Sequence, residues 1–408
     1  MSRTPVTLSG SFMAEREVAR AMTILGAKSA RFVGGAVRDA LLGRPVIDID
    51  VATTLSPQAV MERLGKAGIT TVPTGLDHGT VSARLPHRTI EITTLRRDVE
   101  TDGRHARVAL IDDWDEDARR RDFTINALYL DQAGKLYDPV GGLADLRAGR
   151  VRFIGKAEAR IGEDGLRLLR FYRFFAHYGK GEADRDARAA CRKLAGLAAG
   201  LSAERVRTEL MKLLGAPNPV PALQIMAADG VLAAILPEAV RFDRLAGLIG
   251  VEKAPDALRR LAALAAVDKP GATALARRLN LTKDERSRLE ALAAPACASD
   301  LGAGETQQQR ALFKLGRAIY RDLVLLSGDA ARVPRLLAMA DTLAIPIFPL
   351  KGADVVALGV SPGPDISRWL AAIEEWWEKR DYAPNRDCCL AELRKRLAGR
   401  NRIDAKRH

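Results

Sequence analysis

The sequence predicts an α+β protein in which a strand-containing front part precedes an all-helical remainder. Two segments of alternating apolar and polar residues, 79–85 and 88–94, lie within the first 150 residues and have the period of strands. From Ala157 onward the apolar residues recur at helical spacing, and Ala and Leu, which favour helices, are abundant after residue 180. A chain of 408 residues is long enough for several domains.

The composition points to a basic protein of a reducing compartment. The formal net charge of +13 favours a polyanionic partner such as nucleic acid, with a basic protein that has no such partner as the alternative. The four cysteines (Cys191, Cys297, Cys388 and Cys389) form no C-x-x-C pair, so we expect reduced thiols, a cytoplasmic location and no zinc site. The sequence contains no run of about 18 apolar residues, so it predicts no membrane span, and residues 1–10 lack a signal-peptide pattern.

The front part is expected to alternate helices and strands. Ser56 and Pro57 are a good N-cap and first residue for one helix, and Gly43 with Pro45 should end the helix before it. The expected elements are, in order, a helix within 11–28, a strand at 30–34, a helix at 39–42, a strand at 46–51, a helix at 57–67 and a hairpin of 79–85 with 88–94.

Asp48 and Asp50 are the sharpest chemical feature of the sequence. In a strand, residues i and i+2 share a face, so the two carboxylates should lie side by side. That arrangement is unfavourable unless a positive charge lies over it, and a pair of divalent cations with oxygen ligands fits. Glu91 is the candidate third ligand, with an exposed strand glutamate as the alternative.

Two groups upstream and downstream of these carboxylates are candidates for binding phosphate. A glycine turn at Gly34 and Gly35 can lay backbone N–H groups against phosphate, and Arg38 would add a guanidinium. The basic run Arg119–Arg121 precedes an apolar segment and is a second candidate, although such runs are often only solvated patches. A metal site beside a phosphate cradle indicates nucleotidyl or phosphoryl transfer.

Two later segments carry further predictions. Residues 96–118 show no clear period, and we expect a long functional loop there. Residues 163–175 are expected to form one helix on which polar residues recur every three positions, namely Asp164, Arg167, Arg170 and Arg173. Asp164 with Arg167 is either a surface ion pair or a pair that reads the hydrogen-bonding edge of a base, and the spacing does not decide between them.

Five motifs follow one another in an order that resembles one known family. They are Gly34–Asp39, Asp48–Asp50, Arg120–Leu128, Asp138–Gly142 and Glu163–Arg170. On these motifs the chain resembles the class II CCA tRNA nucleotidyltransferases, whose superfamily includes bacterial poly(A) polymerases. The resemblance is close over about residues 30–215 and loose beyond them.

The resemblance implies an architecture and an activity. The expected domains are a polymerase-β-like nucleotidyltransferase head with a small mixed sheet (1–150), a helical neck for base selection (151–215), a helical body (216–345) and a helical, RNA-binding tail (346–408). The implied reaction is the template-independent addition of CCA to the 3′ end of tRNA from CTP and ATP, with release of pyrophosphate by two-metal-ion transfer. No membrane and no obligate protein partner are implied. The alternatives are a poly(A) polymerase of the same family and, in another class, a non-catalytic RNA-binding protein.

The resemblance also implies roles for individual residues. Asp48 and Asp50 would bind two Mg²⁺. The residues expected to bind the nucleotide are Gly35, Arg38 and Arg121 at the triphosphate or ribose, Asp122 and Asn126 near the sugar, Asp164 and Arg167 at the base, and Arg170 and Arg173 in support. Residues 96–118 match the family's flexible loop, and its full length favours addition of the complete CCA.

Overall fold

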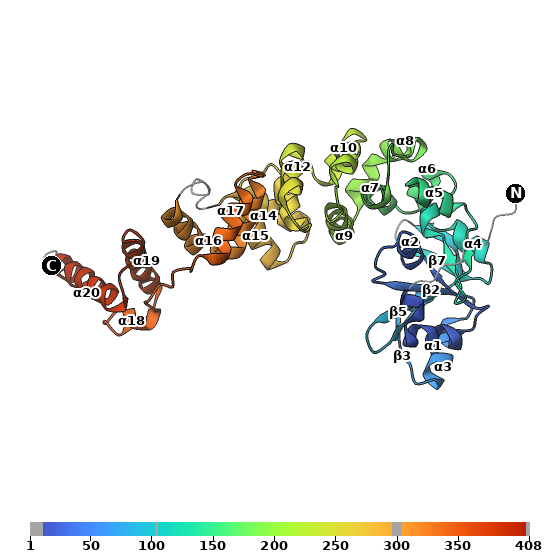
Figure 1. Cartoon of the computed structure of the whole chain (residues 1–408), viewed down its shortest axis with the longest axis horizontal. Helices are drawn as coiled ribbons and strands as arrows, with labels where there is room; N and C mark the ends of the chain where they lie inside the picture. Colours follow the sequence, from blue (N-terminus) through green and yellow to red (C-terminus); the bar gives the residue numbers. More distant parts are fainter. Residues whose placement is uncertain (1–10, 103–104, 296–303, 405–408) are drawn as a thin grey trace. The chain divides into compact units, whose positions relative to one another are not determined.

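The structure, a computed structural model, describes residues 11–102, 105–295 and 304–404. Residues 1–10 and Cys297, for which the sequence carried predictions, lie outside the described residues. The chain forms two compact units, one that extends to Phe242 with two short later segments, and one that contains most of the chain from Asp243 onward. The first unit contains the strands and the second is helical (Figure 1), which confirms the α+β prediction.

A small mixed sheet forms the centre of the first unit. Its seven strands lie in the order β3-β4-β5-β2-β1-β8-β9. β2 is antiparallel to β1 and parallel to β5, so it lies inside the sheet with neighbours on both sides. The strands are β1 (Ala30–Val33), β2 (Ile49–Thr53), β3 (Thr70–Gly75), β4 (Thr80–Arg84), β5 (Thr89–Thr94), β8 (Tyr129–Leu130) and β9 (Leu136–Tyr137).

Three helices of the front part pack on this sheet or beside it. They are α1 (Arg16–Leu25), preceded by the 3₁₀ turn η1 (Ser11–Ala14), α2 (Gly35–Leu41) and α3 (Pro57–Lys66). α3 contacts α1 and strands β3 to β5, while α2 contacts β1 and β2. As predicted, Ser56 caps α3 by accepting a hydrogen bond from the Ala59 N–H, with Pro57 as the first helical residue.

Two boundaries in the front part differ from the prediction. The helix expected at 39–42 begins earlier, at Gly35, because Gly34 has a φ of 66° that ends β1 and turns the chain directly into α2. The strand expected at 46–51 begins later, at Ile49, because ladder pairing with β1 and β5 starts there. Asp48 therefore lies just before β2, and only Asp50 belongs to it.

Residues 96–118 are more regular than predicted. They form a two-stranded antiparallel sheet of β6 (Arg96–Asp102) and β7 (His105–Leu110), followed by α4 (Trp114–Arg119). Arg96–Asp102 is mostly polar and shows no apolar alternation, so the sequence carries no strand signal there. Asp113 caps α4 by accepting hydrogen bonds from the N–H groups of Asp115 and Glu116.

The rest of the first unit is helical. It contains η3 (Thr124–Asn126), α5 (Gly142–Ala148), α6 (Ala157–Glu163), α7 (Leu166–Tyr178), α8 (Arg185–Lys193), η4 (Ala195–Gly200), α9 (Ala203–Leu214), α10 (Val220–Ala228) and α11 (Val231–Ile235). α7 packs against α9 and α10. The single helix predicted for 163–175 is wrong, because Asp164 has the extended angles φ −152° and ψ 107° and separates α6 from α7.

The second unit contains nine described helices and confirms the all-helical prediction for the rear of the chain. They are α12 (Phe242–Val251), α13 (Ala257–Leu264), α14 (Lys269–Arg278), α15 (Lys283–Ala293), α16 (Glu305–Leu326), α17 (Val333–Thr342), α18 (Gly352–Val356), α19 (Pro364–Glu378) and α20 (Arg386–Asp404). Trp377 is buried among Phe313, Phe348 and Tyr382 and links the last helices to α16. None of the helices in the described part of the chain combines the length and apolar character needed to cross a bilayer. The domain boundaries predicted at 150, 215 and 345 stay predictions.

Candidate active site

Asp50 lies in the interior of the mixed sheet. It is paired in register with Val33 of β1 on one side and with Glu91 of β5 on the other. Register neighbours on adjacent strands point to the same face about 4.8 Å apart, so the Asp50 and Glu91 carboxylates share a face. Asp50 is half-buried, whereas Glu91 and Asp48, two residues before Asp50, are exposed. The predicted carboxylates therefore gather at the start of β2.

The electrostatics of this group favour a cation. Burial raises the pKa of Asp50, and the charges of Glu91 and Asp48 raise that pKa further, while Arg121 and Arg38 oppose the rise. Within the described residues, no group of three or more His, Cys, Asp or Glu side chains is placed to hold a metal ion unaided. Mg²⁺ usually takes only one or two carboxylates and completes its shell with water and substrate phosphates, so Asp48 and Asp50 fit such an ion. Glu91 as a third ligand stays a prediction.

The glycine turn faces these carboxylates directly. A Cβ atom added to Gly34 would lie 3.8 Å from the Asn126 carbonyl oxygen, 3.9 Å from Arg121 Nη1 and 4.0 Å from Asp50 Oδ2. The next residue, Gly35, opens α2, whose first-turn N–H groups have no partner within the helix. A carboxylate, a guanidinium and a helix N-terminus thus converge on one small space beside Gly34.

Arg121 is held so that one end of its guanidinium points into this space. Its Nε and Nη2 groups donate to Asp117 Oδ2 at 3.2 and 3.0 Å, and Nε also donates to the Tyr129 hydroxyl. Asp117 binds Arg120 as well, and its side chain is only 1% exposed. Burial works to raise the pKa of Asp117, but Arg121 and Arg120 hold that pKa at about 2. The arginine end near Gly34 and Asp50 is Nη1, which these anchors leave available.

Arg38 is more constrained than the sequence suggested. Its Nε and Nη2 groups grip the two oxygens of Asp39, Nη2 also donates to the Tyr178 hydroxyl at 2.7 Å, and Nη1 donates to Asn126 Oδ1 at 2.6 Å. These four bonds use four of the five N–H donors of the guanidinium. The Nε and Nη2 groups of Arg38 therefore bind Asp39 as a bidentate ion pair. A single Nη1 hydrogen remains for another acceptor.

Asp122 and Asn126 connect the strand-containing part of the first unit to helix α7 through hydrogen bonds. The Asn126 amide donates to Asp122 Oδ1 at 2.9 Å, and Arg170 of α7 donates to Asp122 Oδ2 at 2.7 Å. Burial works to raise the pKa of Asp122, yet Arg170 and Asn126 hold that pKa at about 2. On its far side Arg170 faces Glu209 of α9 at 3.7 Å, so the chain of charges continues across the helices.

Arg173 and Phe174 complete this cluster. Arg173 donates to Glu209 Oε2 at 2.5 Å. The buried ring of Phe174 lies under three guanidinium groups, with centroid distances of 5.3 Å to Arg38, 5.3 Å to Arg170 and 4.1 Å to Arg173. Cation–π contacts of this kind are favourable at these separations. One aromatic side chain thus packs against three of the predicted nucleotide-binding arginines.

Asp164 and Arg167 do not form the i,i+3 pair considered from the sequence. Asp164 accepts two hydrogen bonds from Arg205 of α9, at 2.9 and 2.8 Å. Arg167 binds Glu163 at 2.5 Å and the Arg160 carbonyl at 3.0 Å. Both side chains lie at the break between α6 and α7, so the two residues stay close in the chain but point to different partners.

Sequence reasoning missed several partners of the predicted residues, among them Asp117, Tyr178, Arg205 and Glu209. Arg205 and Glu209 are four residues apart on α9, which presents them to α7 on one face. That spacing alone is also typical of a surface ion pair, so the sequence contained no signal that they face Asp164 and Arg170. Tyr178 ends α7, three residues beyond the segment singled out above.

Residues 30–152 match the family described as "Poly A polymerase head domain", and residues 183–242 match the one described as "Probable RNA and SrmB- binding site of polymerase A". The human mitochondrial CCA tRNA nucleotidyltransferase 1 is 35% identical over 392 residues, which cover 90% of this chain and 86% of that protein. The chain belongs to the CCA tRNA nucleotidyltransferase family.

Bacterial members of the CCA tRNA nucleotidyltransferase family are also similar to the chain. The CCA-adding enzyme of Geobacillus stearothermophilus is 40% identical over 226 residues, 55% of this chain and 52% of that protein. The crystal structure of the Bacillus stearothermophilus CCA-adding enzyme in complex with CTP has a TM-score of 0.77 at 28% identity and covers 95% of this chain and 100% of that one. Family membership makes the chain a nucleotidyltransferase, an enzyme class that generally depends on a divalent metal.

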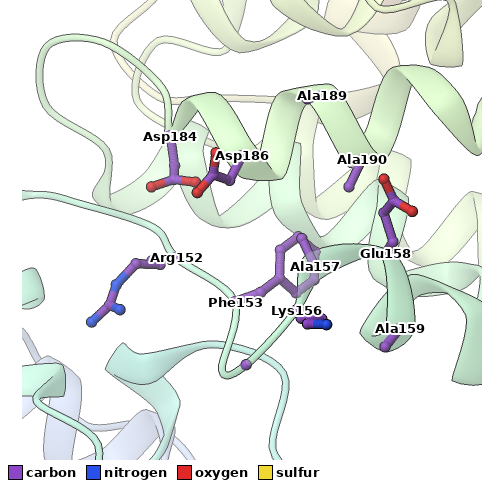
Figure 2. A pocket seen from close by; sticks show the side chains of 11 residues that line it. Arg152, Phe153, Lys156, Ala157, Glu158, Ala159, Asp184, Asp186, Ala189 and Ala190 are labelled. Atoms are coloured by element: carbon purple, nitrogen blue, oxygen red, sulfur yellow. The ribbon is translucent and has the colours of Figure 1, made fainter.

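A separate hollow of about 710 Å³ lies between the segment before α6 and the start of α8. Figure 2 shows Asp184 and Asp186 side by side there, with Arg152 and Lys156 nearby and alanines along the helices. Of the described residues that line it, none belongs to the predicted site. In this member of the CCA tRNA nucleotidyltransferase family, this hollow is thus separate from the chemical groups of the predicted site.

Proposed function

We propose that this protein adds C, C and A to the 3′ end of tRNA from CTP and ATP, and that Asp48 and Asp50 are its catalytic carboxylates. The observation that supports this most is the convergence of Asp50 Oδ2, Arg121 Nη1 and the Gly34 turn on one point. A carboxylate that can hold a metal beside donors that can hold a triphosphate is what nucleotidyl transfer needs.

The reaction follows from these groups. The oxygen of the RNA 3′-hydroxyl loses its proton to water and bonds to the α-phosphorus of the nucleotide, the bond from that phosphorus to the bridging oxygen breaks, and pyrophosphate leaves. Mg²⁺ held by Asp48 and Asp50 would lower the pKa of the hydroxyl and neutralise charge on the α-phosphate and the leaving pyrophosphate. Arg121 binds the triphosphate through Nη1, and the backbone at Gly35 contributes the N–H groups of the first turn of α2.

Around this centre the other predicted residues have supporting roles. Arg38 contributes its remaining Nη1 hydrogen and its charge to the triphosphate. Asp122 and Asn126 lie on the sugar side, where Asp122 also fixes Arg170. Arg173 orients Arg170 through their shared partner Glu209.

Asp164 and Arg167 select the base. Cytosine offers an amino donor to a carboxylate and ring acceptors to a guanidinium, and adenine offers a similarly placed pair. In the structure both side chains have protein partners, Arg205 and Glu163, so base binding exchanges these ion pairs for contacts with the nucleotide. Such an exchange needs no new charge in the site, and it allows the same two residues to accept CTP first and ATP afterwards.

Extension of a truncated tRNA tests this function. Purified protein is given a tRNA that lacks its terminal CCA, with CTP alone, ATP alone or both, and the products are sequenced. We expect two C residues with CTP alone and a single A after them when ATP is present. A poly(A) polymerase is the second candidate, since the head matches a family described by that name. Long A tails on unstructured RNA, with no use of CTP, would favour it and contradict our proposal.

The remaining predictions concern domains and location. We propose that residues 151–215 act as the neck, 216–345 as the body and 346–408 as an RNA-binding tail. We also propose a cytoplasmic location, which Cys191, Cys388 and Cys389, all free in the structure, support. The relatives named mitochondrial leave the mitochondrion as the competing compartment. Microscopy of the tagged full-length chain in its own cell distinguishes the two.

A further inference from the structure

Arg38 owes its position to a closed ring of hydrogen bonds that includes a tyrosine from a distant part of the chain. Arg38 Nη2 donates to the Tyr178 hydroxyl at 2.7 Å, the hydroxyl donates to Asp39 Oδ1 at 3.0 Å, and the same oxygen accepts from Arg38 Nε at 3.1 Å. The Arg38 side chain is only 9% exposed. In such a poorly solvated place each bond constrains the guanidinium strongly, because water cannot replace a lost partner.

The tyrosine ring adds a second contact. Arg38 Cζ lies 4.1 Å from the centroid of the Tyr178 ring, and Arg44 Cζ lies 4.8 Å from it. The ring therefore limits where the Arg38 plane can lie, and the hydroxyl limits its rotation within that plane. Phenylalanine at position 178 would keep the first constraint and remove the second, so the two can be separated experimentally.

Tyr178 lies at the opposite end of α7 from Arg167. α7 runs from Leu166 to Tyr178, so Arg167 is its second residue and Tyr178 its last, about 16 Å apart along the axis. Arg167 belongs to the base-selecting pair, and Arg38 belongs to the triphosphate side. One short helix thus contacts both ends of the proposed nucleotide site, and Tyr178 is its contact with the phosphate end.

We propose that Tyr178 is a positioning residue that fixes Arg38, so that triphosphate binding in the head depends on a neck helix. This inference rests on the proposed function, because it takes Arg38 to face the triphosphate. A positioning residue at the phosphate end affects the binding of the phosphate groups, which CTP, ATP and pyrophosphate have in common. It leaves the choice between bases unchanged.

The test is the full-length Tyr178→Phe variant, with Tyr137→Phe as the matched control. Tyr137 also has a ring over an arginine, Arg31, and its hydroxyl also donates to an aspartate, Asp131, but it has no bond to the proposed site among its described contacts. KM and kcat are measured for CTP and for ATP on truncated tRNA, together with the inhibition constant of pyrophosphate. Thermal unfolding of each variant reports on folding.

We expect KM for both nucleotides and the pyrophosphate inhibition constant to rise together, by about tenfold, as for the loss of one hydrogen bond to a charged group. kcat should change less than KM, and Tyr137→Phe should match the wild type. Asp39→Asn, which weakens the same ring of bonds, should raise the same constants, and the double variant should be no worse than the poorer single one.

Two results would overturn the inference. One is a Tyr178→Phe variant whose constants for CTP, ATP and pyrophosphate equal those of the wild type. The other is a loss confined to one nucleotide, which would place Tyr178 at the base. If the wild type in the same assay adds neither C nor A, the proposed function itself is wrong, and this outcome is distinguishable from both.

Discussion

Replacing Asp117 by asparagine should weaken the head and the triphosphate contact together, because one buried carboxylate orients two arginines. Asp117 accepts from Arg120 at 2.6 Å, from Arg121 at 3.0 Å and from the Tyr129 hydroxyl at 2.7 Å. The amide of asparagine has nearly the same shape, but it carries no charge and its nitrogen end would face donors. The substitution therefore tests the charge rather than the packing.

The size of the effect follows from the pKa of Asp117. A carboxyl whose pKa is about 2 instead of 3.8 favours its charged form by roughly 2.5 kcal/mol. Breaking a buried ion pair by removing one partner costs about 3–5 kcal/mol. We therefore expect D117N to lower the free energy of unfolding of the head by about 2–4 kcal/mol. Loss of the Arg121 anchor should raise KM for CTP and ATP by about tenfold.

Hydrogen exchange in increasing urea measures the unfolding of head peptides separately from the helical second unit. Asp115→Asn is the control, since Asp115 lies on the same helix α4 and is exposed. The stabilisation from Asp117 is fully present above the unfolded-state pKa near 3.8 and is lost as the pH falls through about 2. The stability gap between wild type and D117N should thus be constant above about pH 5 and close towards pH 2. If D117N matches D115N at neutral pH, or if the gap persists at pH 2, the reasoning is wrong.

Three further predictions concern the chemistry, the base choice and the packing. Asp50→Asn should abolish nucleotide incorporation while gel-shift binding of tRNA persists; residual wild-type activity would contradict the metal assignment and favour a non-catalytic RNA-binding protein. Arg167→Ala should relax the choice between CTP and ATP in single-nucleotide assays more than it weakens RNA binding, and equal losses for all four nucleotides would count against base readout. Gly142→Ala should destabilise the head by more than about 3 kcal/mol in urea unfolding, because the new Cβ would lie 2.1 Å from the Thr124 carbonyl oxygen. Gly162→Ala, in a helix with open space around it, should be neutral or stabilising by up to about 1 kcal/mol, and similar losses for both alanines would refute the steric argument.

The parts of the fold that could be predicted are those with a local signal. Alternation predicted β4 and β5, and the N-cap at Ser56 predicted the start of α3. Asp164 was misassigned because a three-residue spacing looks the same in one helix and across a break. Asp164 accepts a local hydrogen bond from the Leu166 N–H and also pairs with Arg205, 41 residues later, and no local pattern contains the second contact.

The candidate site was predictable to a similar extent. Residue types and their order indicated Asp50, Arg121 and Asp122 as site residues, because each belongs to a short motif with several chemically distinctive side chains. Their partners could not be predicted, since Tyr178 meets Arg38 across 140 residues and the folded helices decide which carboxylate each arginine meets. The sequence also suggested that Arg38 offers its fork to phosphate, whereas that fork is occupied by its neighbour Asp39.

The ring of Phe174 has a consequence for how this enzyme can change. Because Arg38, Arg170 and Arg173 all rest on it, a substitution at one of these positions alters the surface that supports the other two. The effects of single substitutions among these four residues should therefore not add. A change at one of these arginines is therefore expected to require compensating changes at the others. Fewer sequences of single substitutions would keep the enzyme active than if the four positions were independent.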